Sequence, residues 1–294
     1  MGRAGRTDPA RRGRCRPGRR TCRVPCRPAD GVVARSMIEL DQGGDSYGQR
    51  QLVAPPADLV PVIEYAWIHR RDCAPAPTDR HWRIVPDPSG HLIYSASGNA
   101  TPRLCLVGAR SRWVDIDVSA RDVTVGIRFR PGAIGQGVRT GGVTMTDRSV
   151  ALAEIRTGSN LVDRAANAVS DRDRVAMLFH EVRQWNWAVA SDWRTRAVVA
   201  MAHAGETRIG EMVDATGVSP RTLRDVARRD IGLSPKRMAR IVRLARTMRA
   251  ALGSPSTSWG ELAAHAGFSD QAHLIRDSRA LLGQSPARFL ARSD

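Results

Sequence analysis

Between about residues 37 and 143, apolar and polar positions alternate in short runs that predict β-strands. Along the last run Val123, Val125 and Ile127 occupy every second position, and a period of two places such residues on one face of a strand. The runs are HWRIVP, GHLIYS, RLCLVGA, RWVDIDV and DVTVGIRFRPG. Because Gly, Pro, Ser or Asn separate them at nearly regular spacing, we expect a small antiparallel barrel or sandwich. One helix is expected before these strands, over residues 56–68 (PADLVPVIEYAWI).

The pattern becomes helical from about residue 150 to residue 204. Apolar residues there recur at steps of three and four, as they do on one face of an amphipathic helix. They are Val175, Leu178, Phe179, Val182 and Trp185. Two interpretations stay open for this stripe: a helix that packs within its own domain, or a helix used for dimerisation or for contact between domains.

One sequence motif near the C-terminus occurs twice. Residues 217–235 read GVSPRTLRDVARRDIGLSP, and residues 267–286 read GFSDQAHLIRDSRALLGQSP. An offset of fifty aligns the first part of the two copies, and an offset of fifty-one aligns the rest, so that Gly232 matches Gly283. A repeat of this kind predicts one structural unit that is used two times.

The first copy carries the signals of a helix-turn-helix. Gly217 suits the left-handed turn at the end of a first helix, and Ser219 is a good N-cap for a second helix that begins with Pro220. Val218 and Leu223 occupy the two positions of a hydrophobic staple. Two short helices joined by a tight turn that contains glycine make a helix-turn-helix.

The second copy opens with a capping box at Ser258 and Glu261. Its extra residue favours Asp270 as the N-cap of the second helix, with Leu274 turned inward. Between the copies, the segment KRMARIVRLARTMRAAL predicts a connecting helix with arginine on its outer faces. The apolar face of that helix is expected to consist of Met238, Ile241, Leu244, Ala245, Met248 and Leu252.

The net charge of +17 is concentrated at the two ends of the chain. Residues 1–36 carry a net charge of +9, residues 191–294 carry +7, and the middle of the chain carries +1. Basic ends around a nearly neutral middle indicate a polyanionic partner. The first segment has almost no apolar residues, so we expect a disordered head. It is either a basic arm that adds affinity for DNA or, if the protein starts at Met37, a segment that is not translated.

No motif for catalysis, a metal or a cofactor emerges. The five cysteines are odd in number and contain no C-x-x-C pair, which argues against a disulfide framework or a zinc site and fits a reducing cytoplasm. His69, His81 and His91 form no H-x-H or H-x-x-H pair. Apolar runs of membrane-spanning length are also missing from the sequence. We therefore expect no metal, no cofactor, no enzymatic activity and no membrane partner.

Residues 192–294 resemble the AraC-type transcription regulators. The resemblance is carried by GFSDQAHLIRD and LLGQSPARF, with RTL and IGLSPKRMARIVRLARTM in support. More weakly, residues 52–137 resemble the β-barrel N-terminal domains of some of these regulators, through EYAWI, IVPD, HLIYS and VGIRFRPG. The resemblance implies that the second helix of each unit enters the major groove of double-stranded DNA. A small-molecule effector, RNA polymerase and a second copy in a homodimer remain open as further partners.

On this resemblance, outward side chains of the two second helices would contact bases. These candidates are Arg221, Arg224 and Asp225 in the first unit and Gln271, His273 and Arg276 in the second. Arginine suits guanine, glutamine suits adenine, and aspartate can accept a hydrogen bond from the cytosine amino group. Contacts to phosphates, which fix register without reading sequence, are expected from Ser219, Thr222, Arg228 and Ser269. For each of these residues the alternative is a solvated surface side chain.

The sequence departs from the family pattern at two core positions. Ala227 and Ser278 stand where an aromatic residue is usual. Small residues at these positions reduce the apolar volume of the core in both units. Trp259, which the repeat aligns with Ile209, is expected to compensate.

The expected fold class is α+β. We expect a disordered head (1–36), a β-rich barrel or sandwich for effector binding or dimerisation (37–145), a helical linker (146–190) and an all-α domain of two helix-turn-helix units (191–294).

The function expected of this arrangement is sequence-specific transcription regulation, with response to a small molecule. Two alternatives stay open. One is a non-specific nucleic-acid binder driven by charge. The other is an alkyl-transfer DNA-repair regulator using Cys73 or Cys105, although neither cysteine stands in a Pro-Cys-His motif.

Overall fold

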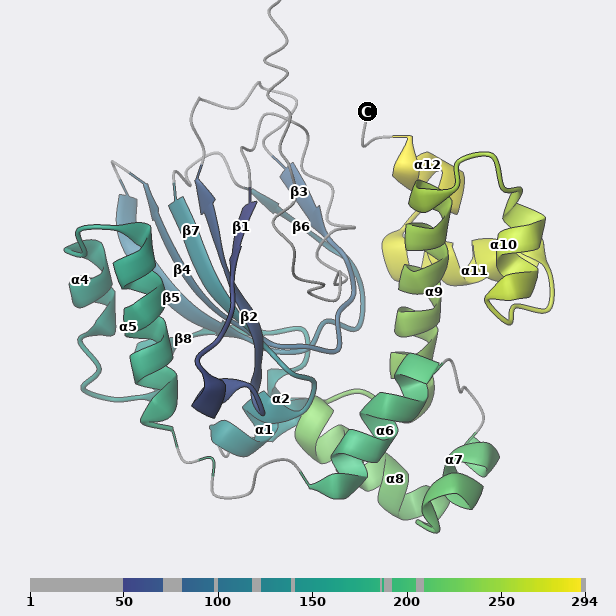
Figure 1. Ribbon diagram of the computed structural model, residues 1–294, viewed down its shortest axis with the longest axis horizontal. Coiled ribbons are helices and arrows are strands. Elements are labelled where there is room, and N and C mark those ends of the chain that lie inside the picture. The colour runs from purple at the N-terminus through teal and green to yellow at the C-terminus, as the bar shows by residue number, and fades with distance from the viewer. Residues whose placement is uncertain are drawn as a thin grey trace, which may run out of the picture. The chain divides into compact units, whose positions relative to one another are not determined.

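The computed structural model describes residues 50–70, 81–97, 100–117, 123–138, 141–185, 187, 192–204 and 209–291 (Figure 1). All of them belong to one compact unit, residues 36–294. The expected disordered head lies outside the described residues, as do Cys15, Cys22, Cys26 and Cys73.

Eight strands form two antiparallel sheets in the described part of the chain. The large sheet has the spatial order β1 (Arg50–Val53), β2 (Ile63–Arg70), β7 (Val123–Phe129), β4 (His91–Ser97), β5 (Ala100–Val107) and β8 (Ser149–Ala151). The small sheet pairs β3 (His81–Ile84) with β6 (Val114–Asp117). Each of the five predicted runs therefore contains a strand. Because β1 and β8 are the two edges of the large sheet, the arrangement is sandwich-like and not a closed barrel.

Helices cover one face of the large sheet. In Figure 1, α4 (Leu161–Ala166) and α5 (Asp171–Arg183) stand against this face, and α5 contacts β2 and β7. Helix α5 begins with a capping box between Ser170 and Asp173 and buries Val175, Leu178, Phe179 and Val182. Of the two interpretations of this stripe, the structure shows the packing helix.

The predicted helix over residues 56–68 is wrong. The structure has a short 3-10 turn, Ala57–Leu59, followed by strand β2. Two causes act together. Pro61 lacks the backbone N–H that a helix interior needs, and β2 gains hydrogen-bonded neighbours on both sides, β1 and β7, which sequence periodicity cannot reveal.

Strand β7 is buried on both faces, whereas its alternating pattern predicts one exposed face. All seven of its residues are buried, because α5 packs on one face and side chains of the neighbouring strands β2 and β4 cover the other. On the face away from α5, Tyr65 and Trp67 pack with Ile93. A side chain at Gly126 would lie 2.5 Å from the indole of Trp67, so the glycine makes room for that ring.

The C-terminal part is helical. Before it, three short helices flank strand β8: α1 (Ala133–Gly137), α2 (Gly142–Met145) and α3 (Leu152–Ile155). Helix α6 (Trp193–Ala204) leads into the repeat. The repeat contains α7 (Ile209–Thr216), α8 (Pro220–Val226) with a π-helical turn (Ala227–Ile231), α9 (Pro235–Gly253), α10 (Trp259–His265), α11 (Gln271–Leu282) and α12 (Pro286–Leu290). None of the helices in the described ranges has both the length and the apolar character that crossing a bilayer requires.

Residues of the β-rich region contact the two repeat copies at matching places. The hydroxyl of Thr146 donates to the carbonyl of Gly232 at 3.0 Å, and the backbone N–H of Trp113 donates to the carbonyl of Leu281 at 3.2 Å. Gly232 and Gly283, which the repeat aligns, both have positive φ, 87° and 78°. A Cβ atom on Gly283 would lie 2.5 Å from the indole of Trp113. The β-rich region therefore touches the end of α8 and its continuation in one copy and the end of α11 in the other.

Candidate DNA-binding surface

The first copy forms the predicted helix-turn-helix. Helix α7 runs into a turn at Gly217, whose φ of 64° is the left-handed conformation that glycine adopts without strain. The hydroxyl of Ser219 accepts a hydrogen bond from the backbone N–H of Thr222 at 3.2 Å, and Pro220 occupies the first turn of α8. Gly232 ends the second helix in the left-handed conformation, as the sequence indicates.

The second copy has the same architecture with one more residue in its turn. Ser258 and Glu261 form the predicted capping box of α10. Asp270, not Ser269, caps α11, because its carboxylate accepts from the backbone N–H of His273 at 2.6 Å. This hydrogen bond from a backbone N–H, together with one from the Ser269 hydroxyl, lowers the pKa of Asp270. The cap explains the shift of the repeat offset at this turn.

Helix α9 joins the two copies without a break. Its 19 residues span about 28 Å at the usual rise of an α-helix, which is comparable with the ~34 Å of one turn of DNA. The predicted apolar face is buried at Met238, Ile241, Leu244, Ala245 and Met248. The prediction is wrong for Leu252, the last residue of that face. Its exposed fraction is 50%, because α9 ends at the next residue and extends beyond the core there.

The two second helices, α8 and α11, are called the reading helices below. Their apolar residues point inward as predicted: Leu223 and Val226 in α8 and Leu274 in α11 are buried. Arg221, Arg224 and Asp225 of α8 are exposed, as are Gln271 and Arg276 of α11. Arg221 and Asp225 lie 3.8 Å apart across one turn of α8, with most of each side chain in solvent. Both reading helices thus present polar, arginine-bearing faces to solvent.

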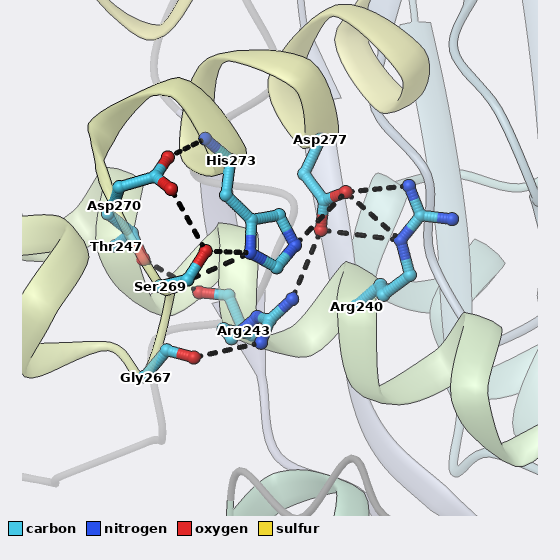
Figure 2. A network of polar contacts seen from close by, with 8 residues as sticks. All are labelled: Arg240, Arg243, Thr247, Gly267, Ser269, Asp270, His273 and Asp277. Atoms are coloured by element: carbon cyan, nitrogen blue, oxygen red, sulfur yellow. Dashed lines mark hydrogen bonds and ion pairs between the residues drawn. The ribbon is translucent and has the colours of Figure 1, made fainter.

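His273 differs from the other candidates for base contact because its ring is partly enclosed. Its side chain is 33% exposed. The ring lies edge-on to Phe268, with 5.2 Å between centroids. Its Nδ1 is 3.1 Å from the hydroxyl of Ser269 (Figure 2). Ser269, a candidate for phosphate contact, is exposed but already bonded to His273 and Asp270. These contacts give both residues a role inside the turn of the second unit.

The remaining candidates for phosphate contact lie in the first unit. Ser219 is exposed at the cap of α8, Thr222 is half-buried beside it, and Arg228 is exposed in the π-helical turn. The hydroxyls of Ser219 and Thr222 lie 2.9 Å apart, so they also bond to each other.

The two small core residues are accommodated differently. Ala227 is fully buried in the helical core, and Ser278 is fully buried with its hydroxyl donating to the carbonyl of Gln284 at 2.8 Å. That bond satisfies a hydroxyl that would otherwise be costly to bury. Trp259 is partly buried against the same core, and its compensation for the two small residues stays a prediction.

Sequence reasoning missed a buried ionic cluster behind α11. Asp277 of α11 lies between Arg240 and Arg243 of α9 (Figure 2). The only signal in the sequence is a set of charged residues within apolar helical patterns, and such residues are normally assigned to a solvated face.

Two family profiles match the chain. Residues 212–292 match a family described as "Helix-turn-helix domain", and residues 51–151 match a family described as "Domain of unknown function (DUF6597)". The first match covers both reading helices and α9. A comparison with curated proteins gives no match.

Among solved structures, the similar chains include the protein ToxT of Vibrio cholerae. The crystal structure of ToxT from strain O395 is 8% identical, covers 73% of this chain and 96% of ToxT, and has a TM-score of 0.41. The structure of unsaturated fatty acid bound wild-type ToxT from strain SCE256 is 11% identical, covers 72% and 89%, and has a TM-score of 0.39. Values this low do not establish a shared fold, so the assignment depends on the two helix-turn-helix units and on the profile match. Together these observations show that residues 212–292 form a helix-turn-helix domain of the kind found in AraC-type transcription regulators.

Proposed function

We propose that this regulator binds DNA sequence-specifically by inserting its two reading helices into neighbouring major-groove segments on one face of the duplex. The observation that carries the proposal is the repeated geometry: two capped reading helices of the same construction, joined by the single continuous helix α9. A continuous helix holds the two units at a fixed separation, and the length of α9, about 28 Å, is comparable with one turn of DNA.

Base readout is assigned to exposed side chains of the reading helices. Arg221 and Arg224 of α8 and Arg276 of α11 are free to extend toward guanine O6 and N7, and Gln271 is free to reach adenine. Asp225 lies close enough to Arg221 to orient it, in addition to accepting from cytosine. Four further residues of the proposed surface would contact phosphates: Ser219, Thr222, Arg228 and Ser269. His273 would contact a base from the turn of the second unit.

The alternative is a non-specific binder, since the residues from 191 onward carry a net charge of +7. Competition binding separates the two functions. A DNA sequence selected from a random library should bind the full-length protein at least about 10³-fold more tightly than random DNA at physiological salt. Equal affinity for all sequences, with a steep dependence on salt, would establish the charge-driven function instead.

We expect Arg276→Ala to relax specificity at one base pair. Loss of a bidentate arginine contact should reduce discrimination at that position by about 5- to 150-fold, which corresponds to ~1–3 kcal/mol. Affinities for the selected site and for its three single-base variants at each position provide the measurement. Arg279→Ala is the matched control, because Arg279 is also exposed but lies nearer the end of α11. A uniform loss of affinity on every probe would instead assign Arg276 to a phosphate.

We also propose that the β-rich region senses a small molecule and passes the signal to the reading helices. The contacts of Thr146 with Gly232 and of Trp113 with Leu281 support this, because they join the β-rich region to the ends of both second helices. Binding of an effector that alters these contacts should change the affinity for the selected DNA site. Titration of candidate compounds against the protein–DNA complex, monitored by fluorescence anisotropy, tests this coupling.

A further inference from the structure

The ionic cluster behind α11 consists of Asp277, Arg240 and Arg243. Arg240 donates from Nη2 to Oδ1 of Asp277 at 2.7 Å, and Arg243 donates from Nη2 to Oδ2 at 3.2 Å (Figure 2). The exposed fractions of the side chains are 6% for Asp277, 8% for Arg243 and 28% for Arg240. A reading helix and the connecting helix are thus joined by charged hydrogen bonds that are largely shielded from water.

Arg243 also holds the turn of the second unit. Its Nη1 donates to the carbonyl of Gly267 at 3.1 Å, and its guanidinium lies 4.1 Å from the centroid of the Phe268 ring. Gly267 has a φ of 77° and Phe268 is buried, so the turn has a defined conformation at both residues. One side chain of α9 therefore contacts the turn and the reading helix at the same time.

The first unit has an uncharged residue at the position that matches Asp277. The repeat aligns Asp277 with Val226, which is buried in α8. An apolar contact tolerates small rotations of a helix, because it has little directional preference. Charged hydrogen bonds from two planar guanidinium groups have a preferred direction and distance. The charged residue in the second unit consequently restricts the orientation of α11 more than a valine would.

Arg240 and Arg243 both favour the ionised form of Asp277. Burial alone raises the pKa of a carboxyl group, but hydrogen bonds and positive charge from Arg240 and Arg243 lower the pKa of Asp277 below its ordinary value. His273 of α11 lies 4.0 Å away and completes the surroundings on the solvent side. The carboxylate is thus ionised at neutral pH and can keep both arginines in place.

We propose that Asp277 is a positioning residue for DNA recognition, which fixes the angle of the second reading helix against α9 and so sets the spacing at which both units engage one duplex. The inference rests on the proposed sequence-specific function. Buried ion pairs often add little to stability compared with apolar residues, and a role in fixing one geometry is the use that explains their presence here.

The test compares spacing preference in the full-length protein. Two probes are used: the selected DNA site, and the same site with one base pair inserted between the two segments. We expect the wild-type protein to bind the inserted probe about 100-fold more weakly, because only one unit keeps its base contacts. For Asp277→Asn this ratio should fall to about 10-fold or less, because α11 can then reorient to follow the displaced segment.

Two further variants separate positioning from a loss of stability. Asp214→Asn makes the same chemical change at an exposed residue of α7 and should keep the wild-type ratio. Arg240→Gln removes the more exposed arginine and leaves the contact of Asp277 with Arg243, so it should fold well and give an intermediate ratio. Partial unfolding lowers affinity for both probes equally and leaves the ratio unchanged.

The outcomes distinguish the two proposals. A wild-type ratio near 100 that is unchanged in both Asp277→Asn and Arg240→Gln would overturn the positioning role and leave sequence-specific binding intact. A wild-type protein that binds both probes equally would also overturn it. If no selected site exceeds random DNA in affinity, the proposed function itself fails, and the positioning role fails with it.

Discussion

Phe289→Ala is expected to unfold much of the DNA-binding region at physiological temperature. Phe289 is fully buried in the helical core, which contains residues of both repeat copies, and the repeat aligns it with Met238 of α9. Replacing a fully buried phenylalanine with alanine typically costs about 3–5 kcal/mol, a large fraction of the stability of an ordinary domain. Ala227 and Ser278 already keep this core small, so few neighbouring side chains are large enough to fill the cavity. Urea unfolding, monitored by circular dichroism at 222 nm, gives the change in the free energy of unfolding.

The control for this prediction is Leu252→Ala, which removes a large apolar side chain at a position that is 50% exposed. It should leave the unfolding midpoint nearly unchanged and should preserve DNA binding. A small loss of stability in Phe289→Ala, comparable with that of the control, would contradict the expectation that this core cannot fill the cavity.

Arg128→Met is expected to destabilise the β-rich region by about 3–5 kcal/mol, because it leaves the buried carboxylate of Asp87 and the half-buried carboxylate of Glu64 without their partner. Arg128 on β7 is 4% exposed and donates to Glu64 at 2.7 Å and to Asp87 at 2.9 Å, with a second contact to Asp87. Asp87 also accepts from the backbone N–H of Ser89 at 2.9 Å. Tryptophan fluorescence during urea unfolding monitors this region. The comparison variant is Arg183→Met, which breaks an exposed pair with Asp58 and should have no measurable effect.

The same cluster gives the protein a defined sensitivity to acid. Burial disfavours the charged form of Asp87, but the positive charge of Arg128 and the hydrogen bond from His91 hold the pKa of Asp87 below its ordinary value of 3.8. The unfolded chain then binds more protons than the native state, so stability is present above that value and is lost as the pH falls through and below it. In Arg128→Met this loss of stability with acid should shrink, since the lowered pKa depends on the arginine. An unchanged pH dependence would mean that Asp87 is not the responsible group.

Local sequence signals predicted most of the helical architecture. These signals are properties of short segments: glycine at the ends of helices, serine or aspartate at their starts, and apolar residues at steps of three and four. The repeat contains each of them twice. Even the choice of Asp270 over Ser269 as the cap of α11 followed from the one-residue shift between the copies. The strands that follow residue 80 were predicted for the same reason, because alternation is visible over five or six residues.

The errors in the β-rich region and the missed ionic cluster share one physical cause, which is contact between distant segments. Strand β2 lies where a helix was predicted because its neighbours, β1 and β7, decide its conformation. Burial of both faces of β7 depends on what covers each face of the sheet. The alternation of residues along one strand does not reveal this. The cluster around Asp277 joins residues more than thirty positions apart, so no local pattern contains it. The orientation of base-reading side chains toward DNA stays a prediction from the sequence, supported by their exposure on α8 and α11.

Base-resolution footprinting on a selected DNA site tests whether both reading helices engage one duplex, with the wild-type protein compared with Arg224→Ala and Arg276→Ala. We expect two protected major-groove segments about ten base pairs apart on one face of the duplex. Each variant should lose protection in a different segment. A single protected segment, two segments on opposite faces, or the same loss in both variants would contradict binding by two reading helices.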